Sequence, residues 1–134
     1  MTETGLRTAL GALGRPVVSL FTLCAGRGAP QIDLPIAYGR PESVHAVELD
    51  EDGDGIPGLK TWAFDVCFDE LPRELDAFLT ECLIAATATP GVRVAWLALD
   101  GGFELDDVLS PTLSEHVYGV CFAGRVPRLA PGLR

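Results

Sequence analysis

Two stretches of the chain carry hydrophobic residues at the three- and four-residue spacing of an amphipathic helix. The longer one runs from about residue 70 to residue 88, and its apolar stripe is Leu71, Leu75, Phe78, Leu79, Cys82 and Leu83. We expect Pro72 to lie in the first turn of this helix, where a missing N–H removes no hydrogen bond. The shorter stretch covers residues 3–13 and ends before Gly14 and Pro16.

Five other stretches have the β-branched and aromatic content of strands. Residues 17–24 and 92–99 are apolar on both faces, which is typical of strands in the centre of a sheet. Residues 44–49 and 60–68 alternate in character, and the loop between them is short enough for an antiparallel hairpin. The last predicted strand is residues 117–123.

Residues 32–38 also alternate in hydropathy, but Pro30 and Pro35 interrupt the region. Proline cannot donate a hydrogen bond to a neighbouring strand, so this stretch is predicted to be either an edge strand or an extended loop.

The order of these elements predicts the fold class. Runs of strands interrupted by one long helix are typical of α+β proteins. We expect a mainly antiparallel sheet of about five strands, with the helix at about 70–88 packed on one face, and a short N-terminal helix. A length of 134 residues and a hydrophobic fraction of 48% suit a single α+β domain covering residues 1–134. No apolar run approaches the ~20 residues that a membrane-spanning helix needs.

Acidic residues are concentrated in the middle of the chain. The formal net charge is −9, from 19 Asp and Glu against 10 Lys and Arg. Residues 42–81 hold twelve of the acidic residues, and the basic residues among them are Lys60 and Arg73. The excess argues against direct binding to DNA or RNA, because phosphate contacts need a basic surface. It favours a basic protein partner, which a negative field attracts and orients.

The candidate partner-binding residues are ten carboxylates of this acidic stretch, which would act by charge complementarity alone. They are Glu48, Asp50, Glu51, Asp52, Asp54, Asp69, Glu70, Glu74, Asp76 and Glu81. Trp62 would anchor such an interface if its side chain were exposed. The alternative interpretation is an acidic surface that serves only to keep the protein in solution.

The acidic loop that begins at Asp50 contains the first half of a calcium-binding loop. Asp50, Asp52 and Asp54 occupy the first, third and fifth positions, and a glycine follows in the sixth. The twelfth position, which needs a bidentate glutamate, is Thr61. We therefore expect at most a weak Ca²⁺ site and no other cofactor. The alternative is a hairpin loop in which Asp and Gly serve the turn.

No catalytic signature stands out. His45 and His116 are the two histidines, and neither belongs to a recognisable nucleophile–base arrangement. Asp65 is a lone acid within its predicted strand, and it would indicate a functional site only if its face of the sheet were buried.

The cysteines are predicted to be buried, reduced thiols, because none of them is part of a C-x-x-C motif. They are Cys24, Cys67, Cys82 and Cys121. A zinc site made by two cysteines and both histidines is an alternative, although it lacks the close ligand pairs of structural zinc sites. Its ligands would be Cys67, Cys121, His45 and His116.

These features favour a small acidic protein-binding module in the cytoplasm. One form of it is a bacterial immunity or antitoxin-type inhibitor that masks a basic partner surface. Alternatives are a small enzyme or ligand-binding domain, a weak Ca²⁺-binding hairpin protein, and a homo-oligomer that assembles through an apolar sheet face. The N-terminal residues lack the basic start and long apolar stretch of a secretory signal, which favours the cytoplasm.

Overall fold

The computed structural model describes residues 2–12, 14–26, 28–49, 58–99, 105–113 and 116–133. Within these ranges, six strands form one antiparallel sheet in the order β2-β3-β1-β4-β5-β6. The strands are β1 (Val17–Ala25), β2 (Ser43–Leu49), β3 (Leu59–Cys67), β4 (Val92–Ala98), β5 (Val117–Phe122) and β6 (Arg128–Leu129). The helices are α1 (Glu3–Leu10), α2 (Leu75–Ala88), α3 (Leu105–Leu109) and the single 3₁₀ turn η1 (Pro131–Leu133).

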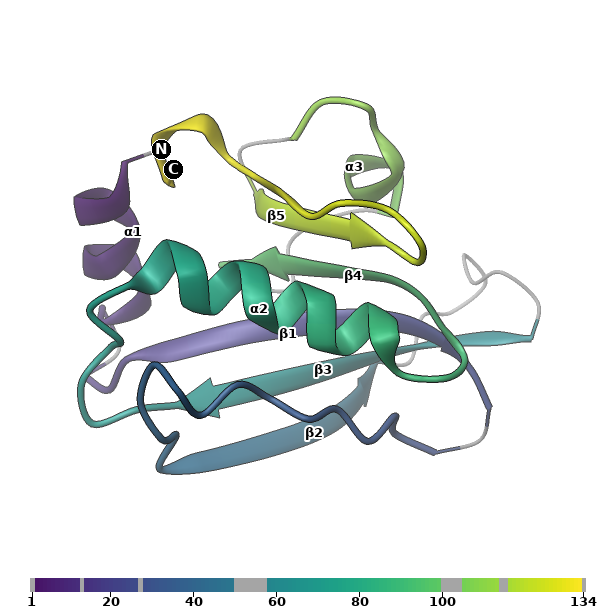
Figure 1. Ribbon diagram of the computed structural model, residues 1–134, viewed down its shortest axis with the longest axis horizontal. Helices are drawn as coiled ribbons and strands as arrows, with labels where there is room; N and C mark the ends of the chain where they lie inside the picture. The colour runs from purple at the N-terminus through teal and green to yellow at the C-terminus, as the bar shows by residue number, and fades with distance from the viewer. Residues whose placement is uncertain are drawn as a thin grey trace.

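The predicted α+β fold is confirmed, and Figure 1 shows α2 lying across one face of the sheet. The predicted hairpin is also confirmed as β2 and β3, which pair antiparallel with Ser43 opposite Cys67 and Leu49 opposite Thr61. The additional strand, β6, is only two residues long, and so it has no periodicity that could reveal it. Residues 32–38 form no strand, and the chain turns at Ala37 and Tyr38, where the N–H of Gly39 donates a 3.3 Å hydrogen bond to the C=O of Ile36.

The long helix begins at Leu75, later than the predicted start at about residue 70. Pro72 therefore precedes the helix and does not occupy its first turn. The carbonyl groups of Pro72 and Arg73 each accept a hydrogen bond of 2.8 Å from the guanidinium of Arg7 in α1. This tertiary contact, together with the preference of the residue before a proline for extended backbone, accounts for the later start.

Five of the six residues of the apolar stripe predicted for the long helix form the centre of the main core, whereas Leu71 precedes α2 and is only partly buried. The α2 side chains Leu75, Phe78, Leu79, Cys82 and Leu83 are at most 1% exposed. They pack against residues that alternate along the central strands, such as Leu20, Phe64 and Leu97, together with Leu6 and Leu10 of α1. The rings of Phe68 and Phe78 meet edge to face, with 5.3 Å between their centroids. Burial of this stripe is what orients the exposed side of α2 toward solvent.

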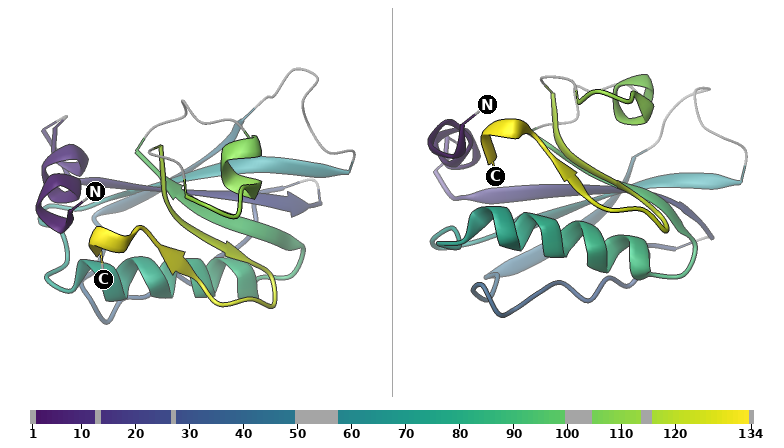
Figure 2. Two further views of the ribbon diagram at one scale, coloured as in Figure 1. Left: turned by 90° about the horizontal axis from the view of Figure 1, so that it is seen from above. Right: turned by 45° about the horizontal axis from the view of Figure 1, so that its top comes forward.

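The opposite face of the sheet is covered only in part. A second cluster, which includes Phe21, Trp96 and Val120, receives Val108 from α3. Figure 2 shows α3 on the side of the sheet opposite α2. At β2 this face is more open: Val47 is 50% exposed, although its register partner Ala63 on β3 is buried. The two faces of one sheet therefore differ in how far they are covered.

Candidate partner-binding surface

Carboxylates without an ion pair follow the end of β3 and continue along α2. Glu70, Glu74, Asp76 and Glu81 are exposed, and none forms an ion pair with another described residue. We call these four the groove carboxylates. Asp69 precedes them and is also exposed.

Other acidic residues do form ion pairs, and one of these pairs lies next to the start of α2, where Arg7 also donates to the carbonyls of Pro72 and Arg73. Glu3 pairs with Arg7 at 3.1 Å, and Glu42 pairs with Arg15 at 2.8 Å. The pKa of Arg15 is raised above its ordinary value, mainly by the hydrogen bond to Glu42 and more weakly by the charge of Asp69. Asp69 is thus partly compensated by Arg15. Glu70 and Glu74 have Arg73 beside them in the second hollow but form no ion pair with a described residue.

A hollow of about 560 Å³ lies against the exposed side of α2. Asp76, Thr80 and Glu81 line it from the helix, and Tyr38 lines it from the segment that precedes β2. The C-terminal part of the chain contributes Val126, Pro127, Leu129 and Leu133. Figure 1 shows these two segments on opposite sides of α2. The hollow therefore combines apolar walls with two carboxylates.

A second hollow, of about 520 Å³, lies next to the first around the start of α2. Its lining includes Glu70, Glu74 and Arg73, and Tyr38 also belongs to it. Because Tyr38 lines both hollows, we treat them as one surface and call it the acidic groove. Tyr38 is held there by an edge-on contact with Phe78, at 6.5 Å between ring centroids, and it packs against the main core.

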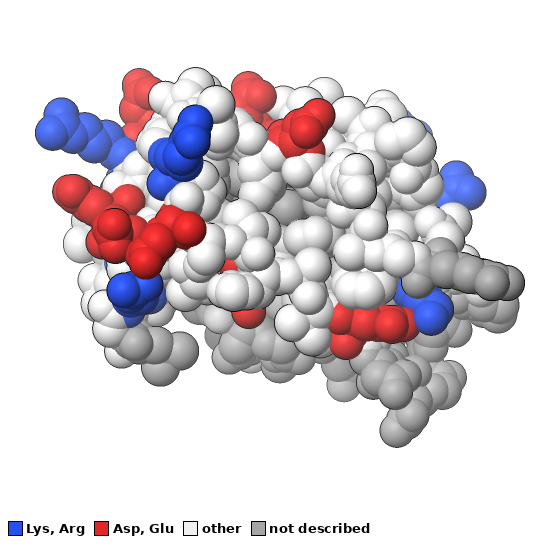
Figure 3. All heavy atoms as spheres, turned by 90° about the horizontal axis from the view of Figure 1, so that it is seen from below, with Lys and Arg blue, Asp and Glu red and all other residues white. Residues whose placement is uncertain are grey.

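The ten predicted partner-binding carboxylates do not all gather in this groove. Glu48 lies opposite Trp62 near the start of β3, whereas Asp69 follows the end of β3, about 20 Å of strand away. Glu48 is also paired with Lys60 at 2.8 Å. Figure 3 shows acidic atoms in separate groups on one face of the molecule, some of them beside basic atoms. Asp50, Glu51, Asp52 and Asp54 lie outside the described residues, as does the predicted Ca²⁺ site.

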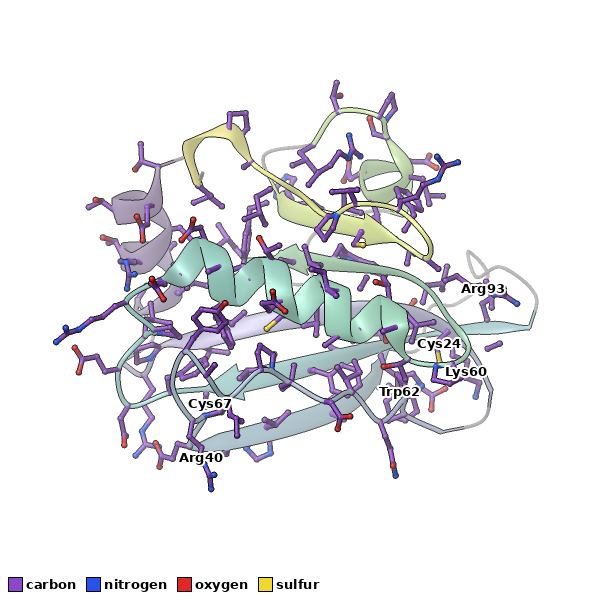
Figure 4. All side chains as sticks on the ribbon, in the orientation of Figure 1. Cys24, Arg40, Lys60, Trp62, Cys67 and Arg93 are labelled. Atoms are coloured by element: carbon purple, nitrogen blue, oxygen red, sulfur yellow. The ribbon has the colours of Figure 1, made fainter. Side chains whose placement is uncertain are left out.

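Trp62 does not provide an exposed anchor. It lies on the side of the sheet that faces α2, is partly buried and packs against the main core (Figure 4). Its indole Nε1 is buried and has no hydrogen-bond partner among the described residues. The apolar anchor points of the acidic groove are instead Tyr38 and Val126, the latter 82% exposed. Sequence reasoning missed both. Tyr38 ends the alternating stretch 32–38, which indicates a strand or loop but not its contact with α2, and Val126 belongs to no periodic pattern.

The structure brings Ser19, Asp65 and His45 into one row across β1, β3 and β2. The hydroxyl of Ser19 donates a 2.9 Å hydrogen bond to Oδ1 of Asp65, and His45 is the register partner of Asp65 on its other side. Ser19 and His45 are therefore two strand spacings apart, about 10 Å. The imidazole cannot take the serine proton over that distance, so the row lacks the geometry of a nucleophilic triad. Asp65 is a partly exposed, hydrogen-bonded residue on the open face of the sheet.

Three of the four cysteines are buried, as predicted, and Cys67 is partly exposed. Burial, with a smaller contribution from the charge of Glu81, raises the pKa of the Cys82 thiol to about 12. Cys121 belongs to the main core, whereas the strand alternation places Cys67 on the opposite face of the sheet. The two cannot share a zinc ion. Among the described residues, no group of three or more His, Cys, Asp and Glu side chains could hold a metal ion.

Comparisons of the chain with protein-family models, curated proteins and solved structures found no significant match. In the described part of the chain, no helix is both long enough and apolar enough to cross a membrane.

Proposed function

We propose that this protein is a small acidic binding module that docks a basic protein partner in the acidic groove. The observation that carries the proposal is the combination in that groove of four carboxylates without ion pairs and apolar walls. Lysine or arginine side chains of a partner would neutralise the groove carboxylates. An apolar side chain of the same partner would fill the hollow between Tyr38 and Val126.

The two parts of the groove would contribute differently to binding. Exposed charges at the edge of an interface mainly raise the rate of association, because they attract the partner before contact. Apolar side chains that become buried in a hollow mainly slow dissociation. The proposed partner is therefore a protein with a basic surface and a protruding apolar residue, bound without any chemical step.

The proposed biological form is a bacterial immunity or antitoxin-type inhibitor that acts in the cytoplasm. A basic surface that binds nucleic acid is the kind of surface that such a groove would cover. The negative charge of the chain supports this form, because an acidic protein competes with phosphate groups for the same arginines and lysines.

The test compares two variants that have the same net charge. The groove variant carries Glu70→Gln, Glu74→Gln, Asp76→Asn and Glu81→Gln. The control variant carries Asp33→Asn, Glu42→Gln, Glu48→Gln and Asp106→Asn, at positions outside both hollows. Binding proteins are captured from the native lysate at low salt, and their association rates are then measured with each chain at several salt concentrations.

The groove variant should associate at least about tenfold more slowly than the natural chain at low salt, and the control variant should differ much less. The difference should shrink as salt screens the charges. An association rate that does not change with salt, or an equal loss in both variants, would overturn the proposal.

A further inference from the structure

The strand β2 forms one edge of the sheet and lacks most of the features that usually protect such an edge; its one charged residue is Glu48. Within the described residues it pairs with β3 alone, over seven residues and without a register shift. Its sequence contains no lysine, proline or bulge, which are the common protections against pairing with another strand. Val44 and Val47 are 45% and 50% exposed and lie on opposite faces of the strand.

The outward-facing backbone groups of β2 can be assigned from the hydrogen bonds of β3. The N–H of Phe68 donates to Pro16 beside β1 at 2.9 Å, and the C=O of Cys67 accepts from Glu42 beside β2 at 2.8 Å. Because these directions alternate along a strand, Cys67 and every second residue before it face β2. Their partners on β2 are Ser43, His45, Val47 and Leu49. The N–H and C=O groups of Val44, Ala46 and Glu48 therefore point away from the sheet.

We propose that a second copy of this chain pairs with β2 antiparallel, about a two-fold axis at Ala46, so that one continuous sheet runs through both copies. Ala46 is the midpoint of β2, so this register pairs every residue of the strand. Val44 then lies opposite Glu48 of the second copy, and Ala46 lies opposite its own equivalent. All outward-facing N–H and C=O groups of β2 then form hydrogen bonds with the second copy. The smallest side chain of the strand lies at the axis, opposite its own equivalent.

The charges of this edge fit a second copy. Glu48, the charged residue of β2, is already paired with Lys60 of its own chain and meets Val44 in this register, so no like charges oppose each other. Figure 4 shows Arg40 beside the first half of β2, with its side chain directed away from the sheet. That half of β2 faces Glu48 of the second copy. Arg40 forms no ion pair with another described residue and is placed to meet that carboxylate.

This inference is independent of the proposed function, because neither hollow of the acidic groove contains a residue of β2. Salt should also change the two affinities, that of the dimer and that of the groove for a basic partner, in opposite directions. Two copies that each carry a net charge of −9 repel each other, so salt should strengthen the dimer. Salt should weaken the attraction between the groove and a basic partner. The failure of one proposal can therefore be distinguished from the failure of the other.

The test is the mass of the full chain in solution, measured by light scattering after size exclusion and by sedimentation. The natural chain should form a dimer at micromolar concentrations, with a dissociation constant that decreases as salt increases. Ala46→Lys and Ala46→Glu each place like charges opposite each other at the axis and should raise this constant at least about tenfold. Ala46→Ser, which adds no charge, should remain dimeric and is the matched control.

An equimolar mixture of Ala46→Lys and Ala46→Glu should restore the dimer, because opposite charges then meet at the axis. Thermal unfolding of each variant checks that this exposed position leaves the fold intact. A natural chain that stays monomeric up to about 100 μM would overturn the inference. So would an Ala46→Lys chain that dimerises as well as the natural one, or a mixture that stays monomeric. Binding of an extended segment of another protein to β2 in place of a second copy would also overturn it.

Discussion

The two faces of the sheet present the same strands in different environments. On the face that α2 covers, Phe64 and Val66 of β3 are at most 6% exposed. On the other face, their neighbour Asp65 is partly exposed and hydrogen-bonded to Ser19. The alternation of β3 predicts that the two sets lie on opposite faces, but the placement of α2 and α3 decides how much of each face is buried. Side chains on the two faces of one strand can therefore contribute different amounts to the free energy of unfolding.

The sharpest test of this comparison removes one side chain from each face. Leu79→Ala leaves a cavity between α2 and the sheet and should lower the free energy of unfolding by about 2–5 kcal/mol. Val47→Ala on the open face should lower it by less than about 0.5 kcal/mol, because Val47 is half exposed. Urea denaturation of both variants measures the difference. Similar losses would contradict the assignment of the two faces.

The buried face should also respond to alkaline pH. The pKa of Cys82 is raised from 9.0 to about 12 in the folded protein, and burial raises the pKa of Tyr118 above 10.0. Both groups ionise first in the unfolded chain, so their stabilising effect is complete below pH 9 and is lost as pH rises toward 12. Each lowers the free energy of unfolding by up to about 1.4 kcal/mol per pH unit in its window.

Denaturation between pH 8 and pH 11 measures this decline, and Cys82→Ala should reduce its slope. A thiol reagent at neutral pH gives a second measurement. It should modify the partly exposed Cys67 in the native protein and leave Cys82 unmodified until the chain unfolds. Rapid modification of Cys82 under native conditions would show that α2 does not seal this face.

A smaller effect is expected from the polar row on the open face. Ser19→Ala removes the 2.9 Å hydrogen bond to Asp65, and it should cost about 0.5–1 kcal/mol because water can replace the lost donor. Thermal unfolding measures this change, with Ser43→Ala on β2 as the control. A loss above about 2 kcal/mol would indicate that Asp65 is less accessible to water than its exposure implies.

The smallest effect concerns the acidic residues of the connection between β2 and β3. If Asp50, Asp52 and Asp54 bind Ca²⁺ weakly, a concentration equal to the dissociation constant would add about 0.4 kcal/mol to the free energy of unfolding. The measurement is the midpoint of thermal unfolding in millimolar Ca²⁺ and in chelator. Asp52→Asn should abolish the shift. An unchanged midpoint in the natural chain would exclude a site of this strength.

Most elements of the fold could be predicted from local patterns. The stripe from Leu75 to Leu83 and the alternation of residues 60–68 each repeat within a single segment, and so they identify a helix and a strand without any knowledge of their neighbours. The start of α2 could not be predicted in this way. It depends on hydrogen bonds between Arg7 and the carbonyls of Pro72 and Arg73, which are distant from Arg7 in the chain.

The candidate site also has one part that the sequence predicts and one part that only the tertiary structure shows. The acidic character of residues 69–81 is a property of composition, and the amino-acid sequence alone determines it. The groove itself joins Tyr38, Asp76 and Val126, three positions from separate parts of the chain. Periodicity predicts which side of a helix or strand is buried, because the spacing of apolar residues within that one segment places them on one side. Which segments meet around an exposed helix depends on the strand order and on packing between distant residues, and no local pattern contains that information.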